Sequence, residues 1–185
     1  MCYRKADERT EAWLQKSGGI DFTIIREGLY SESWPLYFGH YDVSNDDRVD
    51  VPVSGDGKIS WTSIPDLGLA NAMILAAPRE TWKGKVFYLA QEMACTVEEV
   101  AAIVSKAKGK GLKLKVVPMT EHEQYYVQQR GMEDSMVTWW MKTYDALNDK
   151  ECEILDPTLE QLLAKKGVKA KPMEETVAEM MKAQS

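Results

Sequence analysis

The sequence has few residues of the kinds that bind metals or cross-link chains. Three cysteines and two histidines occur among 185 residues, and Cys2, Cys95 and Cys152 lie far apart. Neither His40 nor His122 has a second ligand at the spacing of a zinc or iron site, so we expect no metal. An odd number of scattered cysteines predicts free thiols in a reducing compartment, which favours the cytoplasm.

Long apolar runs and an excess of positive charge are also missing. The chain contains no run of about 18 apolar residues, and its N-terminal segment MCYRKADERTE is too polar for a secretory signal. The formal net charge is −6 and the sequence pI is about 5.1. Such a chain lacks the concentrated basic face that binds phosphate backbones. We therefore expect no membrane span and no nucleic-acid partner.

Two motifs of nucleotide-dependent enzymes are absent as well. A dinucleotide site needs glycines at a strand-to-helix turn, so that backbone amides can close on the diphosphate. The nearest candidate, Gly55-Asp56-Gly57-Lys58, lies between two extended segments and instead predicts a hairpin turn. None of the eight tyrosines has a lysine four residues later. Because that lysine lowers the tyrosine pKa in Tyr-x-x-x-Lys enzymes, the sequence identifies no catalytic acid.

The residues that are present predict an ordinary α/β domain. Apolar residues make up 44% of the chain and charged residues 28%, which is typical of one globular domain. The hydrophobic periodicity alternates between helical and extended segments, which is an α/β pattern with a helical C-terminus. The expected strands are 21–26, 51–53, 58–62, 85–90 and 112–117, and the expected helices are 4–16, 34–41, 65–77, 97–107, 124–130, 135–147, 157–166 and 172–182.

Local signals mark several helix starts. Ser63 has the position of an N-cap, with Pro65 in the first turn that follows. Thr96 and Glu99 have the spacing of a capping box, and so do Thr120 and Glu123. The first two signals predict helices that begin directly after the capping residue, and the third precedes the helix expected at 124–130.

Several stretches, taken in order, resemble the NmrA-like family of atypical short-chain dehydrogenases. They read TEAWLQKSGGIDFTIIREGLYSESW at 10–34, ISWTSIPDLGLANAMILAAP at 59–78 and GKVFYLAQEMACTVEEVAAIVSKAKGKGLKLKVV at 84–117. The run REGLYSESW is similar to a run in NmrA-like quinone oxidoreductases, and residues 155–181 resemble the closing segment of fungal members. The resemblance implies the C-terminal part of an NmrA-like Rossmann-type fold, with an incomplete parallel sheet and a helical substrate lobe. Residues 1–185 would form a single domain fragment without the glycine-rich nucleotide-binding half.

The resemblance also implies a cofactor and an activity. Whole members bind NAD(P), and the implied activity is NAD(P)H-dependent reduction of a small carbonyl or quinone. In the family, the end of the first predicted strand contacts the nicotinamide side of the cofactor, so Arg26, Gly28, Leu29 and Tyr30 would line that site. The residues themselves leave an alternative open, in which Arg26 pairs with a local carboxylate and Gly28 serves the turn. Without the glycine-rich half, we expect weak cofactor binding or none.

A run of aromatic residues follows the same strand. These rings could form the wall of a flat apolar pocket for a quinone or another small aromatic or carbonyl ligand. The alternative is that they pack in the core. The candidate substrate-binding residues are Tyr30, Trp34, Tyr37, Phe38, Tyr41 and Trp61.

The strand expected at 21–26 also leads to a prediction about protein partners. By resemblance it would be an inner strand of a wide sheet, and without its neighbours both of its edges would be open. An open edge with an exposed apolar face predicts a homodimer or a partner protein that covers it. The alternative function is therefore a non-catalytic regulatory or interaction module.

Overall fold

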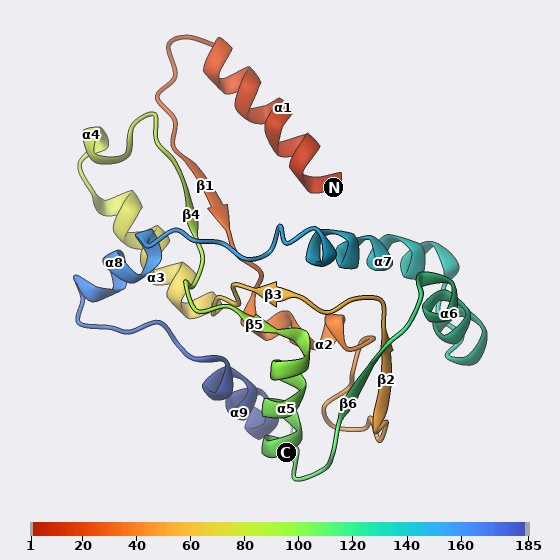
Figure 1. Cartoon of the computed structure of the whole chain (residues 1–185). Helices are drawn as coiled ribbons and strands as arrows, with labels where there is room; N and C mark the ends of the chain where they lie inside the picture. Colours follow the sequence, from red (N-terminus) through yellow and green to blue (C-terminus); the bar gives the residue numbers. More distant parts are fainter. Residues whose placement is uncertain (1, 184–185) are drawn as a thin grey trace.

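The centre of the fold is a pair of parallel strands. The computed structural model describes the backbone of residues 2–183 and the side chains of residues 8–183. Strand β1 (Ile24–Glu27) pairs in parallel with β4 (Val86–Leu89), and Ile24 lies opposite Val86 (Figure 1). Parallel strands need a long crossover, and this one contains helices α3 (Ile64–Ala76) and α4 (Arg79–Trp82). The predicted α/β class with an incomplete parallel sheet is confirmed.

Two further strand pairs correct the predicted hairpin. Strand β2 (Asp50–Val53) pairs in parallel with β6 (Lys113–Val116), and β3 (Lys58–Ile59) pairs antiparallel with β5 (Cys95–Thr96). The prediction that residues 51–53 and 58–62 form a hairpin is therefore wrong. The intervening glycines serve close packing, because a Cβ on Gly55 would lie 2.6 Å from Asn148 Oδ1. One on Gly57 would lie 2.8 Å from the Leu147 carbonyl oxygen.

Two of the three predicted helix caps are present. The Ser63 hydroxyl accepts a hydrogen bond from the Asp66 amide at 3.2 Å, at the start of α3. Thr96 and Glu99 form a complete capping box on α5 (Val97–Lys108). The box expected at Thr120 is wrong, because α6 (Met119–Gln124) begins before Thr120, with Pro118 as its N-cap.

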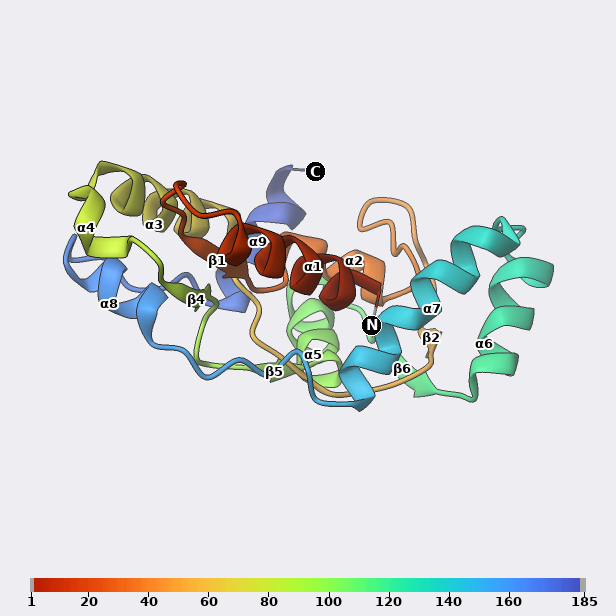
Figure 2. The same ribbon diagram turned by 90° about the horizontal axis from the view of Figure 1, so that it is seen from above.

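The remaining helices surround the strand pairs. Segment η2 (Tyr125–Gln129) continues α6, and α7 (Asp134–Asn148) packs against α6. Helix α8 (Thr158–Ala164) packs on α3 and β4, while α9 (Met173–Ala183) packs on α5. The chain after β1 forms the short turns η1 (Ser31–Ser33) and α2 (Trp34–Tyr37). Helix α1 (Cys2–Lys16) lies above the rest of the chain in Figure 1, and Figure 2, seen from that side, shows it crossing the middle of the molecule.

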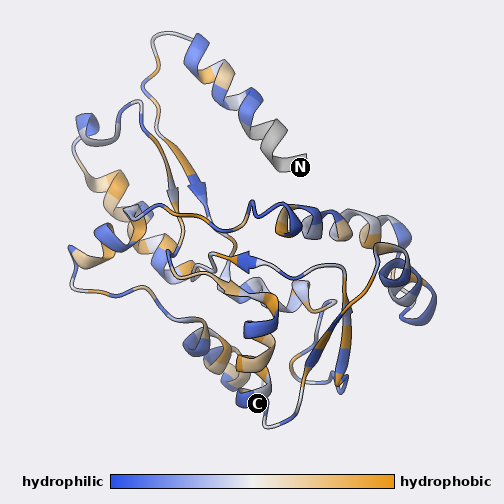
Figure 3. Ribbon diagram, in the orientation of Figure 1, coloured by the Kyte–Doolittle hydropathy of each residue, from blue (hydrophilic) through white to orange (hydrophobic). Residues whose placement is uncertain are grey.

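The buried side chains form two clusters. The larger one is rich in aromatic residues from α2, η2 and α7, and it includes Trp34, Phe38, Tyr126, Trp140 and Tyr144. The smaller one fills the space between β4, α3 and α8, with Leu67, Ile74, Leu89, Leu159 and Leu163. Figure 3 shows the corresponding hydrophobic colour along α3 and a hydrophilic carboxyl end on β1.

Strand β1 is less enclosed than the sequence suggested. Ile24, Ile25 and Arg26 are half-buried and Glu27 is exposed, whereas an inner strand of a parallel sheet is covered on both faces. The prediction that both edges are open is wrong, because β4 occupies one of them. No other strand in the described part of the chain pairs with the second edge.

Candidate functional site

The carboxyl ends of β1 and β4 lie side by side, because the two strands run in the same direction. This is the edge at which ligands bind in open α/β sheets. The chain leaves β1 through Gly28, Leu29 and Tyr30, and it leaves β4 through Ala90 and Gln91. The four residues named from the sequence as a cofactor site therefore all lie at or next to this edge.

Arg26 is engaged by protein groups. Its guanidinium forms a two-pronged contact with the Glu11 carboxylate of α1, with Nη2 2.8 Å from Oε1 and 2.7 Å from Oε2. Nη1 donates to the Tyr88 hydroxyl at 2.8 Å. The hydrogen bonds to Glu11, and next to Tyr88, raise the pKa of Arg26. This is the local carboxylate pairing considered as the alternative, and it ties α1 to both strands.

Gly28 is required by close packing. It is buried, and its amide donates to the Leu89 carbonyl oxygen at 2.9 Å. A Cβ at this position would lie 2.8 Å from Thr62 Oγ1, 2.9 Å from Ala90 Cβ and 2.9 Å from the Ser60 carbonyl oxygen. Leu29 follows with its carbonyl oxygen bonded to the Thr62 amide, and its side chain packs against the larger core cluster. Neither residue presents a polar side chain to a ligand.

Tyr30, Glu27 and Asn71 form an accessible polar group at the end of β1. The Tyr30 hydroxyl donates to Glu27 Oε2 at 3.0 Å, and the Asn71 side-chain amide donates to Glu27 Oε1 at 2.9 Å. Tyr30 is 41% exposed. The hydrogen bond to the Glu27 carboxylate raises the pKa of the Tyr30 hydroxyl, which stays protonated at neutral pH. We call these three residues the strand-end triad.

Asn71 was missed by sequence reasoning. It lies 44 residues after Glu27 and is held in place by a second bond from its amide to the Leu67 carbonyl oxygen at 2.9 Å. The only sequence signal for it is an amide side chain within the otherwise apolar helix α3. Such a position marks a polar contact but does not name the partner.

The aromatic residues proposed for a substrate pocket lie in the core. Trp34, Tyr37, Phe38, Tyr41 and Trp61 are each at most 6% exposed. Their rings contact one another, with the Trp34 and Phe38 centroids 5.1 Å apart and those of Tyr37 and Trp61 5.4 Å apart. Burial raises the pKa of the Tyr37 hydroxyl far above its usual range. Of the six candidates, only Tyr30 presents a polar atom at an accessible surface.

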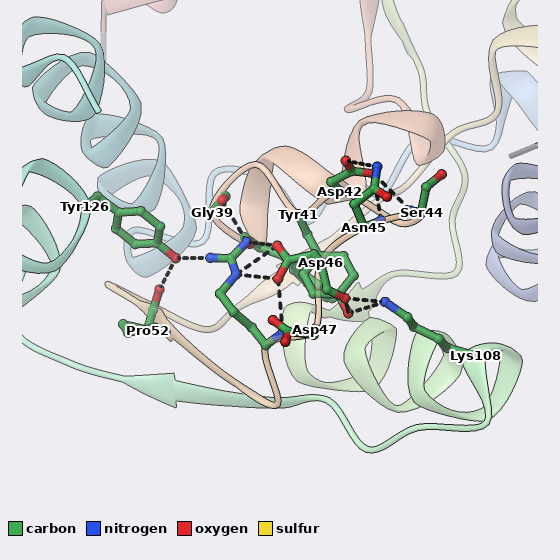
Figure 4. Close-up of polar contacts among 12 residues, drawn as sticks. Gly39, Tyr41, Asp42, Ser44, Asn45, Asp46, Asp47, Pro52, Lys108 and Tyr126 are labelled. Carbon is green, nitrogen blue, oxygen red and sulfur yellow. Dashed lines mark hydrogen bonds and ion pairs between the residues drawn. The ribbon is translucent and has the colours of Figure 1, made fainter. Parts of the chain in front are cut away.

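A second polar cluster lies away from the strand end and holds the loop between α2 and β2 (Figure 4). Arg48 and Asp46 form an ion pair whose side chains are only 7% and 5% exposed. Burial raises the pKa of Asp46, but the hydrogen bonds from Arg48 outweigh it, so that the pKa falls. Arg48 also donates to the Gly39 carbonyl oxygen at 3.1 Å, and Lys108 donates to the Tyr41 hydroxyl at 2.8 Å.

Gly39 itself is closely covered in this cluster. Its φ of +64° is in the left-handed region, and a Cβ would lie 1.9 Å from the Tyr126 hydroxyl oxygen. That hydroxyl donates to the Pro52 carbonyl oxygen at 3.0 Å. The cluster is therefore explained by packing and by loop anchoring.

No group of three or more metal-binding side chains occurs among residues 8–183. No helix in the described ranges is both long and apolar enough to cross a membrane. The described cysteines, Cys95 and Cys152, are free thiols.

Comparison with curated proteins identifies relatives. A family model described as the NmrA-like family matches residues 16–181. An NmrA-like family domain-containing oxidoreductase of Aspergillus flavus is 26% identical over 118 residues, which are 64% of this chain and 36% of that protein. Quinone oxidoreductase 2 of Escherichia coli is 35% identical over 107 residues, which are 57% of this chain and 35% of that protein. The matched region is thus little more than a third of the length of either relative.

Solved structures agree with the fold. Triphenylmethane reductase of Citrobacter sp., complexed with NADP(H), superposes with a TM-score of 0.75 at 21% identity, covering 91% of this chain and 56% of that one. The NADPH-dependent quinone oxidoreductase of Escherichia coli superposes with a TM-score of 0.73 at 26% identity, covering 95% of this chain and 61% of that one. Because the family model covers most of the sequence and the parallel α/β arrangement agrees with these structures, the chain belongs to the NmrA-like family.

Proposed function

We propose that this chain contributes the substrate side of an NAD(P)H-dependent oxidoreductase that reduces a small carbonyl or quinone compound. The observation that carries the proposal is the strand-end triad, an accessible hydrogen-bonding group at the ligand-binding edge of a parallel strand pair. The Glu27 carboxylate can accept a further hydrogen bond from a ligand amide, and the Tyr30 hydroxyl oxygen can accept another. The NAD(P)H-linked names of the relatives supply the reaction class.

The residues of this chain fit the nicotinamide end of the implied cofactor but not its diphosphate. The strand-end triad offers polar contacts suited to a nicotinamide carboxamide, and hydride transfer is the chemistry that NAD(P)H supplies when bound. For the diphosphate, the 185 residues contain no glycine-rich turn that opens a helix. We therefore expect the isolated chain to bind NADPH poorly. Isothermal titration of the chain with NADPH tests this expectation, and a micromolar dissociation constant would contradict it.

A chimera tests the oxidoreductase proposal directly. The nucleotide-binding half of the Escherichia coli quinone oxidoreductase would be joined ahead of residue 8, and reduction of a panel of quinones and aldehydes would be followed by NADPH absorbance. We expect turnover in the chimera, and lower kcat/KM when Glu27→Gln or Asn71→Leu disrupts the strand-end triad. Glu98→Gln, on the exposed surface of α5, is the matched control. A chimera that binds NADPH but reduces none of the panel would refute the proposal.

A second candidate, a non-catalytic interaction module, is favoured by the unpaired edge of β1. Trp13 and Ile20, which lie on α1 and in the segment between α1 and β1, are 63% and 58% exposed. A homodimer or a partner protein would cover this edge and these side chains. Size-exclusion chromatography with light scattering should then give the mass of a dimer. A monomer that binds no hydrophobic dye would count against this candidate.

The proposal also places the chain in the cytoplasm. The free Cys95 and Cys152 thiols support a reducing compartment. Burial raises the pKa of Cys152 to about 11, so that this thiol stays protonated.

A further inference from the structure

A cavity lies at the amino-terminal end of β4, opposite the end that carries the candidate site. Its volume is about 350 Å³, which is within the range of small-ligand sites. Two elements form its walls, the turn from α4 into β4 and one face of α8. The lining residues are Trp82, Lys85, Val86, Phe87, Thr158, Gln161, Leu162 and Lys165, none of which is acidic.

Hydrogen bonds to the backbone fix the turn that carries the aromatic wall. The Trp82 and Phe87 rings lie 4.8 Å apart at an interplanar angle of 43°. The Trp82 carbonyl oxygen accepts the Thr23 hydroxyl at 2.9 Å and the Lys85 amide at 3.1 Å. The Gly84 amide donates to the Phe22 carbonyl oxygen at 2.8 Å, which closes the turn. The apolar surface is therefore preorganised, and a flat ligand can bind without first ordering a loop.

The opposite wall is one side of a helix. Thr158, Gln161 and Leu162 lie on one face of α8, and Lys165, the C-cap residue with helical backbone angles, continues the same spacing. Helix α8 packs on β4, and Leu162 and Phe87 belong to the same buried cluster. Figures 1 and 2 both show α8 beside β4.

Two ammonium groups flank the cavity in a chain of net charge −6. Lys85 Nζ lies 5.1 Å from the centroid of the Trp82 ring. Among the described side chains, neither Lys85 nor Lys165 forms an ion pair. The neighbouring Asp156 carboxylate already accepts the Tyr88 amide, the Thr158 amide and the Thr158 hydroxyl. Both lysine charges are therefore available to a bound anion.

We propose that this cavity binds a small planar aromatic anion, such as an aromatic carboxylate. The ring packs against Trp82 and Phe87, and the carboxylate lies between Lys85 and Lys165. Aromatic contact supplies affinity for any flat ring, while the two ammonium groups select the charged form. Because the cavity is at the other end of β4 from the strand-end triad, this site is independent of the proposed oxidoreductase function.

The test compares two probes that share a ring. Isothermal titration with 2-naphthoate should show binding, and 2-naphthylmethanol, which lacks the charge, should bind about tenfold more weakly or worse. The double variant Lys85→Gln/Lys165→Gln should lose this preference, since glutamine keeps much of the stem but removes both charges. Lys166→Gln, next to the cavity but not lining it, is the matched control and should behave as the unmodified chain.

A second variant separates charge from folding. Lys85→Arg/Lys165→Arg keeps both charges and should retain the preference for naphthoate, whatever the double glutamine variant does to stability. Equal affinity for the two probes, no binding of naphthoate at millimolar concentration, or undiminished binding in the double glutamine variant would each overturn the proposal.

Discussion

Within the part of the chain that the structure describes, His122 is a histidine that is held by aromatic packing alone. Its side chain is fully buried among Tyr126, Trp140 and Tyr144, with ring centroids 4.6, 4.6 and 5.4 Å away. Neither imidazole nitrogen has a hydrogen-bond partner among the described residues. Burial lowers the pKa of His122 from 6.5 to about 4, so the residue is neutral in the folded chain.

This neutral histidine predicts a loss of stability in mild acid. The unfolded chain binds a proton at His122 near pH 6.5, whereas the folded chain binds it only near pH 4. The free energy of unfolding should therefore fall as the pH is lowered between these values, by up to about 3 kcal/mol. Urea unfolding across this range measures the effect. The variant His122→Phe should flatten the dependence, and an unchanged slope would contradict the assignment.

Gly28 and Gly68 give opposite predictions for the same substitution. Gly28→Ala places a methyl group within 2.9 Å of three atoms of the surrounding packing, so we expect a loss of about 1–3 kcal/mol. Gly68→Ala, in the interior of α3, meets nothing within 4 Å and should stabilise the chain by about 0.5–1 kcal/mol. Thermal unfolding of the two variants compares them, and a stable Gly28→Ala protein would show that the close approach is not needed.

At the level of elements, the sequence predicted what is encoded locally. The Ser63 cap and the Thr96–Glu99 capping box lie within four residues of the helices they begin, and both are present. The predicted hairpin is absent. Gly55 instead packs against Asn148, a contact that sequence neighbours do not reveal because the two residues are far apart in the chain. The box at Thr120 failed because Pro118 starts the helix earlier.

In the candidate site, too, the local features could be predicted from the sequence and the long-range contacts could not. The position of the candidate site at the end of β1 could be predicted, because the order of the strands and the family resemblance both indicate that strand end. The Arg26–Glu11 pair joins residues 15 positions apart, and the Glu27–Asn71 bond joins residues 44 apart. Neither partner can be read from a strand pattern alone, since the tertiary fold brings them together.

Glu11 attaches helix α1 to the strand pair. The Glu11 carboxylate accepts Arg26 Nε and Nη2, and Arg26 continues to Tyr88 on β4. We expect Glu11→Gln to weaken this attachment and to speed hydrogen exchange of the α1 amides, while β4 exchanges as before. Arg9→Gln, at an exposed position of the same helix, is the matched control. Exchange in α1 that does not change would show that other contacts hold the helix.

For the whole molecule, the central feature is a two-stranded parallel pair that is covered on one side by α3 and α8. Parallel sheets in α/β proteins are normally wider and enclosed on both faces. The chain corresponds to 56–61% of the two solved relatives described above, which fits an incomplete sheet. The domain extent proposed from the sequence and the nature of any partner stay predictions.

The close contact at Gly39 has a consequence for how the sequence can vary among relatives. A methyl group at position 39 would overlap the Tyr126 hydroxyl oxygen, and the left-handed backbone independently disfavours any L side chain there. The two positions should therefore covary. A homologue with asparagine or aspartate at 39 should carry a smaller residue at 126, and its Arg48 counterpart should need another partner for the guanidinium.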